Sequence, residues 1–413
     1  MDEPQFICID CIGDSYLQAQ IEDDSNIELC DYCAENARSV TLLSLAKKVD
    51  QVYRAHYRLG EYCPTFYGER DRPDYRQKGD SPEEIITEMI KASYEEVAND
   101  ICNLLDGMES WDVGKDGAEA MYDFSSCYQH ITMGAGYHHS LWDDFCEDIK
   151  HGTRFFSLDA KSKLNKVFAN ISDYSSFAGK KVIREISGIP IYRARKANTL
   201  AEIEKVTSQP AVELAAPPKN LAVNGRMNPI GVSIFYGAFD RDTCIAELRP
   251  AVGETIVCGE FKEAKQLRVF DFTMLNNVTA LSMFDPCYAE KHSQLMFLRD
   301  FESIISKAFL PSDTDLEYLP LQAMAEYLAR FVAGGVEGII FPSAQRAGAA
   351  KNIVVFDHHN RAKMHKSVTN KEDAMTPYLK FVEDSISVHK IEAVEYQESV
   401  VPLPVFFADL LEA

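Results

Sequence analysis

Residues 225–250 read GRMNPIGVSIFYGAFDRDTCIAELRP, and this stretch predicts a turn, a strand and a helix in direct succession. Its first seven residues hold two glycines and a proline, which favour turns. The β-branched and aromatic run Val232–Tyr236 predicts the strand, and the glycine that follows ends it. Asp240 or Asp242 can then cap a helix that begins near Thr243. The stretch therefore predicts a tight strand-to-helix connection with polar side chains at the ends of its elements.

Short strands and helices are predicted on both sides of this stretch. Ile191–Arg195 predicts a strand in which Arg193 and Arg195 share one face, because strand side chains alternate. A linker rich in proline and alanine covers 209–220. The pattern predicts an α+β domain with a mostly antiparallel sheet rather than a regular βαβ wind. The other predicted elements are strands at Thr255–Phe261, Gln266–Phe272, Val336–Phe341 and Asn352–Asp357 and helices at 289–309 and 320–333.

The N-terminal half is predicted to form a compact α-helical domain. Ala37–Leu59 and Glu83–Leu105 carry apolar residues at helical spacing. Pro82 directly after Ser81 favours the start of the second helix. Further helices are predicted at Ser140–Ile149 and Ala160–Ala169.

Composition and charge restrict the class of protein. The chain has 413 residues, with 46% hydrophobic and 26% charged residues, ordinary values for a chain that buries apolar cores. Its net charge is −22, and residues 1–180 carry −17 of it. Because an acidic surface repels phosphate backbones, we expect no direct nucleic-acid partner. The sequence holds no apolar run of about 18 residues and no basic-then-apolar N-terminal signal, so we expect a cytoplasmic protein without a membrane partner.

Four of the eleven cysteines form two CxxC pairs, Cys8 with Cys11 and Cys30 with Cys33. The separation of the pairs is typical of four-thiolate zinc sites. Each CxxC turn supplies one edge of a tetrahedron, and four protein ligands leave no open position, so this zinc would be structural. Redox pairs and coincidence are the alternatives, and the doubled motif favours zinc. The other seven cysteines are predicted to be small buried side chains in a reducing compartment.

Several common catalytic signatures are absent from the sequence. It has no GxxxxGK[ST] loop and no GxGxxG after a strand, which argues against an NTPase and a Rossmann dehydrogenase. It has no HExxH motif, and residues 231–235 depart from GxSxG at the last position, which argues against a serine hydrolase. What remains is a set of polar residues at the ends of predicted elements: Arg193, Arg195, Arg226, Tyr236, Glu247, Ser343 and Asn352.

This set of residues resembles the RES-domain family, which is named for an Arg, a Glu and a Ser. The resemblance lies in YRAR (192–195), in the whole stretch 225–250 and in EGIIFPSAQRAGAAKNIVVFD (337–357), and it spans about 170 residues. The stretch 225–250 is the most specific part, because a turn, a strand and a capped helix must coincide there. Met227 departs from the family, which often has an aromatic residue after Gly-Arg. The cysteine pairs and the helical region also resemble the N-terminal extension (HEPN/RES N-terminal-like) that some longer RES proteins carry.

The resemblance implies a fold similar to ADP-ribosyltransferases and an activity that consumes NAD. RES proteins act as toxins of toxin–antitoxin pairs, and they cleave NAD by hydrolysis or by phosphorolysis. In phosphorolysis, inorganic phosphate displaces nicotinamide and gives ADP-ribose 1″-phosphate. Their usual partner is an antitoxin protein with a helix-turn-helix domain, whereas this longer chain can instead be regulated through its own N-terminal domain. A homo-oligomer is also compatible with the sequence.

The resemblance also implies roles for the catalytic set. Cleavage of the nicotinamide–ribose bond develops positive charge on the ribose, which Glu247 would stabilise. Arg226 would bind the pyrophosphate through its planar guanidinium, and Ser343 would bind the nucleophile or a phosphate oxygen. The ordinary alternatives are an exposed helical glutamate, a surface arginine in a salt bridge and a turn serine.

The remaining members of the set would bind the substrate. Arg193, with Arg195 in reserve, would contact the pyrophosphate. Tyr236 would stack on nicotinamide or bond to a ribose, although a core tyrosine is nearly as compatible with its position. Asn352 would bind substrate or only pin the loop 343–351.

These observations predict four parts of the chain: a zinc-binding segment at 1–36, an α-helical domain at 37–180, a RES catalytic domain at 181–360 and a C-terminal extension at 361–413 that packs on it. The charge shift near residue 180 supports a boundary there. The predicted function is cleavage of NAD by phosphorolysis or hydrolysis. A protein mono-ADP-ribosyltransferase on the same fold and a non-catalytic, zinc-bearing partner-binding protein remain as alternatives.

Overall fold

Two units make up the chain, which we describe from a computed structural model. The first unit comprises residues 1–137 with 280–296, and the second comprises 138–279 with 297–413. No helix among the described residues is long and apolar enough to cross a membrane. The structure describes residues 4–22, 25–65, 74–108, 121–131, 136–155, 157–176, 178–278, 281–306, 314–346, 348–356 and 378–395.

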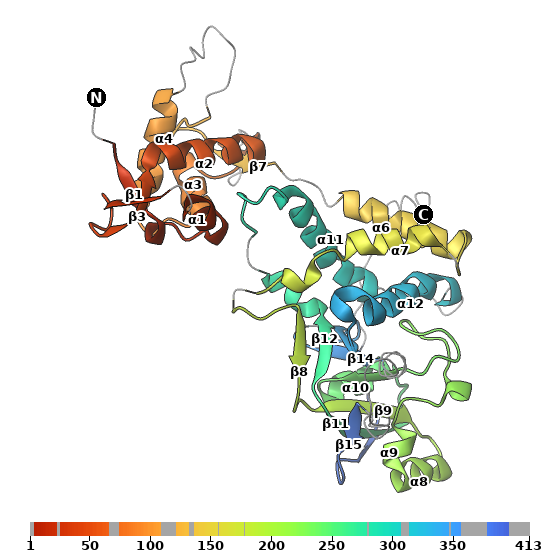
Figure 1. The fold of residues 1–413 in the computed structure, drawn as a ribbon. Helices are drawn as coiled ribbons and strands as arrows, with labels where there is room; N and C mark the ends of the chain where they lie inside the picture. Colours follow the sequence, from red (N-terminus) through yellow and green to blue (C-terminus); the bar gives the residue numbers. More distant parts are fainter. Residues whose placement is uncertain are drawn as a thin grey trace, which may run out of the picture. The chain divides into compact units, whose positions relative to one another are not determined.

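The described part of the first unit combines helices with short strands (Figure 1). Strand β3 (Asn36–Thr41) pairs antiparallel with β1 (Phe6–Cys8) and with β2 (Asn26–Leu29). The buried core under this sheet is formed largely by the apolar faces of the helices. The helices are η1 (Ile9–Cys11), α1 (Ser15–Glu22), α2 (Leu42–His56), α3 (Pro82–Ile90) and α4 (Glu95–Met108), and two antiparallel pairs are β4 (Tyr57–Leu59) with β7 (Tyr128–His130) and β5 (Tyr62–Thr65) with β6 (Asp74–Gln77).

The single helix predicted at Ala37–Leu59 is wrong at both ends. Its first residues form β3, and α2 begins at Leu42, where Thr41 Oγ1 accepts a hydrogen bond from the Ser44 N–H at 3.2 Å. Its last residues form β4. The apolar positions that carry the helical period all lie from Leu42 onward, and strand pairing on both edges of β3 determines the conformation of the residues before them.

The helix predicted at Glu83–Leu105 is two helices. Ser81 caps α3 in a capping box with Glu84, as the Ser-Pro start predicts. The first helix ends at Lys91, whose φ of 53° is left-handed, and α4 begins at Glu95. Apolar residues continue at helical spacing through both helices, which hides the break in the sequence.

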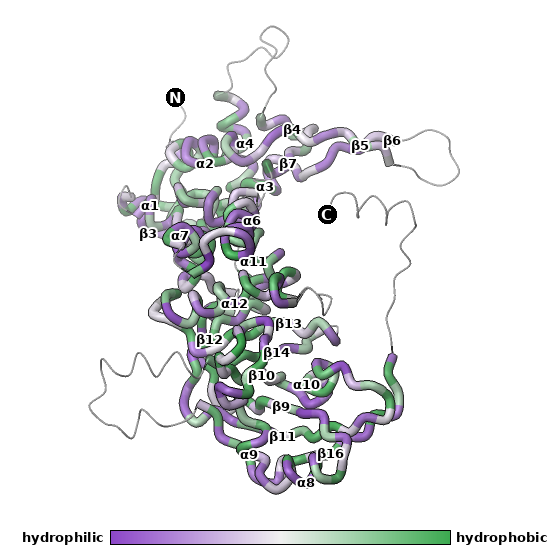
Figure 2. Tube along the Cα trace, turned by 90° about the vertical axis from the view of Figure 1, so that its right-hand side faces the viewer, coloured by the Kyte–Doolittle hydropathy of each residue, from purple (hydrophilic) through white to green (hydrophobic). Residues whose placement is uncertain are grey.

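The second unit is built on a nine-stranded sheet with the order β15-β11-β9-β10-β14-β13-β12-β8, and β16 also pairs with β11. Neighbouring strands are antiparallel except β12 and β13, which confirms the predicted α+β class with a mostly antiparallel sheet. Figure 2 shows that the central strands β13 and β14 are largely hydrophobic, in line with their burial. The strands are β8 (Ile183–Ile186), β9 (Ile191–Lys196), β10 (Phe235–Ala238), β11 (Thr255–Glu263), β12 (Leu267–Asp271), β13 (Gly338–Pro342), β14 (Lys351–Val355), β15 (Leu379–Phe381) and β16 (Ser387–Lys390).

Aromatic side chains join helices of this unit to one another and to its sheet. The ring centroids of Trp142 and Phe301 lie 4.6 Å apart, and those of Phe168 and Phe270 lie 6.3 Å apart. Residues of α6 and α7 therefore group with the large sheet, which differs from the predicted boundary near residue 180. The helices are α6 (Gly136–His151), α7 (Leu158–Val167), η2 (Ile171–Asp173), α8 (Leu200–Ser208), α9 (Pro210–Glu213), η3 (Lys219–Leu221), α10 (Arg241–Glu247), η4 (Phe272–Asn277), α11 (Tyr288–Ser306), α12 (Thr314–Arg330) and η5 (Val332–Gly334).

Two details of the sequence-based expectation are wrong. The linker predicted at 209–220 contains α9, and the next residue, Leu214, is fully buried in the core of the sheet. A side chain at Gly259 of β11 would lie 2.8 Å from Leu214 Cδ1, so this segment packs tightly on the strand. Among the cysteines expected to be buried, Cys287 is exposed.

Candidate functional site

A cavity of about 260 Å³ lies beside β9, β10 and β14 of the second unit. It collects polar side chains from the turn 225–228, from the end of α10 and from the sheet. Five of the seven predicted site residues line it: Arg193, Arg226, Tyr236, Glu247 and Asn352.

Strand β10 and the short helix after it position the centre of this cavity. Ala238 pairs with Tyr192 of β9 on one side and with Asn352 of β14 on the other. Asp240 Oδ1 then caps α10 by accepting a hydrogen bond from the Thr243 N–H at 2.8 Å. Helix α10 follows β10 and makes about two turns before it ends at Glu247. The Glu247 carboxylate therefore lies beside the strands that line the cavity.

The Glu247 carboxylate is held by two side chains from β14 and the end of β13. Ser343 Oγ donates a hydrogen bond to Glu247 Oε1 at 2.6 Å, and Asn352 Nδ2 donates to the same oxygen at 2.8 Å. Asn352 is opposite Phe341 in the β13–β14 pair, two residues before Ser343. The structure therefore brings Glu247 together with Ser343 and Asn352, which follow it by 96 and 105 residues in sequence.

The Arg193 side chain lies where β9 and β10 separate. The two strands pair at Ala238 and Tyr192, and next to this pair Arg193 Nη1 donates to the carbonyl oxygen of Tyr236 at 2.8 Å. Its guanidinium carbon lies 4.9 Å from the centre of the Phe235 ring. Burial, and then the nearby positive charge of Arg195, lowers the pKa of Arg193 to about 10, so the side chain is protonated at neutral pH. Arg195 itself does not line the cavity.

Arg226 lies in a tight turn in which the backbone N–H of each of Gly225 and Asn228 bonds to the carbonyl oxygen of the other, at 2.9 and 3.2 Å. Its guanidinium carbon lies 5.8 Å from the centre of the Tyr318 ring of α12. Burial lowers the pKa of Arg226, and the hydroxyl of Tyr318 and the carboxylate of Glu247 act in the opposite direction. Arg226 and Glu247 thus face the same cavity and influence each other electrostatically.

Tyr236 uses its hydroxyl to hold this turn. The hydroxyl donates to Asn228 Oδ1 at 2.8 Å and accepts from the Met227 N–H at 2.9 Å. A Cβ atom at Gly225 would lie 2.8 Å from this hydroxyl oxygen and 2.4 Å from Asn228 Oδ1, so only glycine fits. Burial raises the pKa of Tyr236, which keeps the hydroxyl protonated. The Tyr236 hydroxyl therefore bonds to other groups of the protein, and Tyr236 also lines the cavity.

Two residues of this site were missed by the sequence analysis. Asn228 Nδ2 donates to the carbonyl oxygens of Val223 at 2.9 Å and Val232 at 3.0 Å, which closes the turn. Gln322 of α12 donates to the carbonyl oxygen of Gly225 at 2.8 Å. Asn228 stands before a proline in a Gly-rich stretch, a signal of turn formation that could have identified it. Gln322 carries no local signal.

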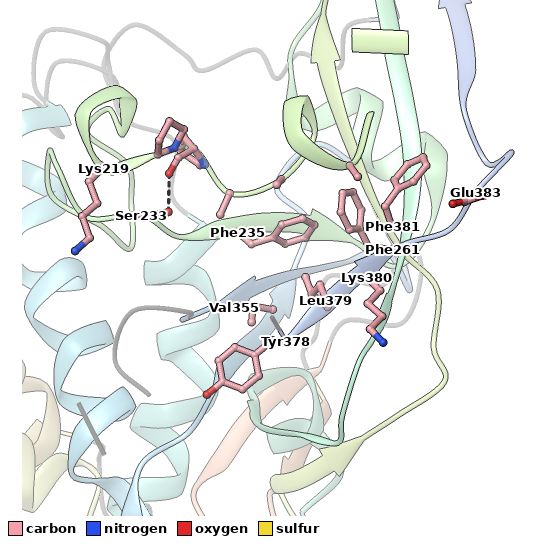
Figure 3. A pocket seen from close by; sticks show the side chains of 15 residues that line it. Lys219, Ser233, Phe235, Phe261, Val355, Tyr378, Leu379, Lys380, Phe381 and Glu383 are labelled. Carbon is pink, nitrogen blue, oxygen red and sulfur yellow. Dashed lines mark hydrogen bonds between the residues drawn. The ribbon is translucent and has the colours of Figure 1, made fainter. Parts of the chain in front are cut away.

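A larger cavity, of about 660 Å³, lies on the opposite face of β10 (Figure 3). Phe235 lines it, whereas Tyr236 lines the smaller cavity, because consecutive strand residues point to opposite faces. Its walls are largely apolar, with aromatic rings from Phe261 and Phe381, and none of the seven predicted site residues lines it. We place the candidate active site in the smaller cavity because charged and hydrogen-bonding groups converge there.

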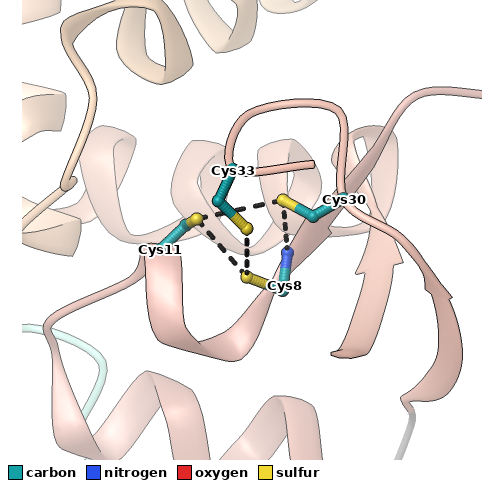
Figure 4. A group of neighbouring side chains, drawn as sticks. All are labelled: Cys8, Cys11, Cys30 and Cys33. Carbon is teal, nitrogen blue, oxygen red and sulfur yellow. Dashed lines mark hydrogen bonds between the residues drawn. The ribbon is translucent and has the colours of Figure 1, made fainter. Parts of the chain in front are cut away.

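The first unit holds the four cysteines of the two CxxC pairs in one cluster (Figure 4). Cys8 Sγ lies 3.3 Å from Cys11 Sγ and 3.6 Å from Cys33 Sγ, and Cys11 Sγ lies 3.8 Å from Cys30 Sγ. Four sulfurs about 2.3 Å from a central zinc would lie about 3.8 Å apart in a tetrahedron. The Cys8 N–H also donates to Cys30 Sγ at 3.3 Å, which orients this ligand. The cluster can therefore hold a metal ion.

The second unit thus has an α+β fold, with a small polar cavity at the end of a strand-to-helix connection. Residues 191–377 match the family described as RES domain. The chain therefore carries a RES domain, which indicates an NAD-related, toxin-like function. No curated protein matches the chain.

Proposed function

We propose that the smaller cavity binds the nicotinamide–ribose end of NAD and that the protein cleaves the bond between nicotinamide and ribose. The observation that carries this proposal is the Glu247 carboxylate, which Ser343 and Asn352 hold at a cavity that also contains two arginines. A fixed carboxylate opposite cationic groups suits a substrate that has an anionic pyrophosphate and develops positive charge at the ribose.

The size of the cavity supports binding of part of the dinucleotide. Its volume of about 260 Å³ is slightly below the range of about 300–1,000 Å³ that is usual for whole ligands of drug or cofactor size. Nicotinamide and its ribose would occupy the cavity, and the adenosine half would extend outside it.

Two buried polar atoms support a ligand in this place. Arg193 Nε and Asn352 Oδ1 have no hydrogen-bond partner in the described part of the chain. Buried polar atoms in proteins are nearly always paired, and a bound substrate would supply the partners here. Arg193 and Arg226 would contact the pyrophosphate, for which planar guanidinium groups provide paired donors.

Glu247 is the proposed catalytic carboxylate. The hydrogen bonds from Ser343 and Asn352 both go to Oε1, so Oε2 can accept a hydrogen bond from a ribose hydroxyl. As the nicotinamide leaves, the negative charge of Glu247 stabilises the positive charge that spreads over the ribose carbon and ring oxygen. Ser343 and Asn352 keep the carboxylate in place while this happens. Arg195, which does not line the cavity, is proposed only as a contributor of positive charge.

The acceptor of the ADP-ribose is water or inorganic phosphate in this proposal. Ser343, whose hydroxyl contacts the Glu247 carboxylate, would bind the water or the phosphate. A fold of ADP-ribosyltransferase type belongs to the same proposal, and transfer to a protein acceptor is its second form. A cognate antitoxin is the proposed protein partner.

The test is NAD loss by the purified protein with and without inorganic phosphate, with the products separated by chromatography. Glu247→Gln is the central variant, because it keeps the size of the side chain and removes its charge. Glu204→Gln, at an exposed position of α8, is the matched control. We expect the wild type and the control to consume NAD at the same rate. Glu247→Gln should consume NAD at least about a hundredfold more slowly, because removing one group that stabilises the transition state electrostatically typically lowers the rate by about 10²–10³.

The products distinguish the forms of the proposal. ADP-ribose 1″-phosphate that appears only with phosphate identifies phosphorolysis, ADP-ribose identifies hydrolysis, and ADP-ribose attached to protein identifies a transferase. Equal rates for Glu247→Gln and the wild type would contradict the assignment of Glu247. Absence of NAD turnover both with and without phosphate would contradict the proposal and favour a partner-binding protein.

Zinc is the metal proposed for the cysteine cluster, because four thiolates in a tetrahedral arrangement are its usual structural ligands. Four protein ligands leave no position for a substrate, so the ion would stabilise the fold of the first unit without taking part in NAD cleavage.

A further inference from the structure

Two thiols lie next to each other at the wall of the candidate active site. Cys244 of α10 lines the cavity and is 7% exposed, and Cys258 of β11 is completely buried. Both are free thiols that belong to one small buried cluster, and α10, which carries Cys244, packs against β11, which carries Cys258. Neither cysteine belongs to the metal cluster of the first unit.

The surroundings of the pair favour a negative charge on one sulfur. Arg241 lies one turn before Cys244 on α10, and the positive charge of its side chain acts on the Cys258 sulfur. The hydrogen bond from Cys244 and then the positive charge of Arg241 lower the pKa of Cys258. The same hydrogen bond, together with burial, raises the pKa of Cys244, which therefore keeps its proton and donates it. A thiol beside an arginine and a second thiol is the environment of reactive rather than inert cysteines.

We infer that Cys244 and Cys258 form a redox-reactive pair, which a peroxide small enough to enter the cavity converts into a disulfide. Cys244 is the sulfur that the oxidant meets, because it lines the cavity. Cys258 is the resolving sulfur, because it is completely buried in the same small cluster as Cys244.

The chemistry balances with hydrogen peroxide as the oxidant. The Cys244 sulfur attacks one peroxide oxygen; the S–O bond forms, the O–O bond breaks, and hydroxide leaves. The leaving hydroxide takes the proton of Cys244 and becomes water, while Cys258 stays a thiolate. This thiolate attacks the Cys244 sulfenic sulfur, the S–S bond forms, and a second hydroxide leaves. The two sulfurs lose two electrons in total, and the peroxide gains them.

The disulfide would act on the active site through α10. Glu247 follows Cys244 by three residues on this helix, so drawing Cys244 toward β11 moves the helix that carries the carboxylate. Loss of NAD cleavage on oxidation rests on the proposed function, whereas formation of the disulfide does not.

The test is a thiol map of the full-length protein after exposure to hydrogen peroxide. The protein is unfolded, free thiols are alkylated, and trypsin digests the chain. Because the Arg249–Pro250 bond resists trypsin, both cysteines lie in one peptide, residues 242–262. We expect this peptide to lose two hydrogens and to carry no alkyl group, and to return to the doubly alkylated form when a dithiol reductant is added first. Cleavage after Glu247 should then leave two fragments joined by the disulfide.

Single variants separate the proposal from general oxidation. Cys258→Ser should stop the reaction at the Cys244 sulfenic acid, which a cyclic 1,3-diketone traps, and Cys146→Ser, in α6, should behave as the wild type. If peptide 242–262 stays doubly alkylated under peroxide that oxidises other thiols of the same sample, the proposal is overturned. Failure of the diketone to label Cys244 in the peroxide-treated Cys258→Ser variant would also count against the proposal. In an NAD assay, peroxide should slow the wild type at least tenfold, reversibly, and leave the Cys258→Ser rate unchanged.

Discussion

Gln322 Nε2 lies 2.8 Å from the carbonyl oxygen of Gly225, which precedes it by 97 residues in the chain. The same amide nitrogen lies 2.7 Å from Asn224 Oδ1 and 3.1 Å from the carbonyl oxygen of Asn228. One nearly buried side chain of α12 therefore fixes both ends of the turn that carries Arg226. Gln322 is a positioning residue in this arrangement, because it acts on the substrate only through Arg226.

We expect Gln322→Ala to slow NAD cleavage without abolishing it. Removing the amide deletes the hydrogen bonds from Gln322 to the turn, and each such bond contributes about 0.5–1.5 kcal/mol to the folding free energy. A misplacement of Arg226 by about 1 Å can lower the rate by up to about a hundredfold. The loss should appear mainly as a higher KM, which distinguishes poor placement of a binding group from loss of the catalytic carboxylate. Gln266→Ala, at an exposed position before β12, is the control; a wild-type KM for Gln322→Ala would contradict the role.

Ser343→Ala and Asn352→Asp test how Glu247 is held. A hydrogen bond to a charged group contributes about 1.5–3 kcal/mol, so Ser343→Ala should lower kcat by about tenfold to a hundredfold. Asn352→Asp replaces a donor by a second carboxylate next to Glu247 Oε1, and one of the two must then hold a proton at neutral pH. Its activity should therefore be lower at neutral pH and rise at higher pH. Ser208→Ala, at the exposed end of α8, serves as the control, and a flat pH profile for Asn352→Asp would contradict the arrangement.

Local signals explain why much of the fold could be predicted. Asp240 caps α10 and Ser81 caps α3 through side chains within four residues, and the sequence shows both. The predictions that failed concern segments whose conformation is determined by contacts with residues far away in the sequence. Residues 36–41 are determined by pairing with β1 and β2, and Leu214 is buried by packing on β11. Such contacts are set by tertiary structure, which a local pattern does not contain.

The site shows the same division. Motifs of a few residues identified the groups that line the cavity, because a strand end and a capped helix place them together. Period two predicts that Arg193 and Arg195 are equivalent, yet only Arg193 lies beside the point where β9 and β10 separate. Gln322 reaches the turn from another element entirely. Its contribution depends on how α12 packs, so the sequence could not reveal it.

Metal removal should destabilise the first unit and leave the second intact. The cysteine cluster connects β1 and η1 with the turn after β2, and zinc binding in small sites supplies about 10–16 kcal/mol. A strong chelator, or Cys30→Ser, should therefore lower the bound-metal content and raise hydrogen exchange in β1, β2 and β3. Exchange in β13 and β14 should not change. Cys63→Ser is the control outside the cluster, and an unchanged metal content in Cys30→Ser would rule out the four-thiolate site.

Acidification should weaken the first unit through its buried histidines. The rings of His56 and His130 are nearly parallel with centroids 6.1 Å apart, and His130 Nε2 lies 3.1 Å from the Tyr288 hydroxyl. Burial, and then the neighbouring His292, lowers the pKa of both His56 and His130. The unfolded chain therefore binds more protons than the folded chain below about pH 6.5, so stability is complete above this value and is lost as the pH falls.

The measurement is hydrogen exchange of α2 amides as a function of pH, corrected for the intrinsic rate. His56→Gln should make the pH dependence shallower, because one depressed group is removed. The metal cluster is present in both proteins, so the difference between their slopes isolates the histidine. His151→Gln, at an exposed position, should keep the wild-type slope. Equal slopes for His56→Gln and the wild type would show that His56 does not contribute.

Truncation tests where the second unit begins. A chain of residues 136–413 keeps Trp142 and Phe168, which pack on Phe301 and Phe270, whereas a chain of residues 181–413 loses both. Removing one buried aromatic side chain costs about 3–5 kcal/mol, and a small domain is stable by only about 5–15 kcal/mol. We therefore expect 136–413 to be soluble with a cooperative thermal transition and 181–413 to aggregate or melt without one. Residues 280–296 are present in both, so they do not affect the comparison. Equal transitions for the two chains would instead place the boundary near residue 180, where the charge of the sequence changes.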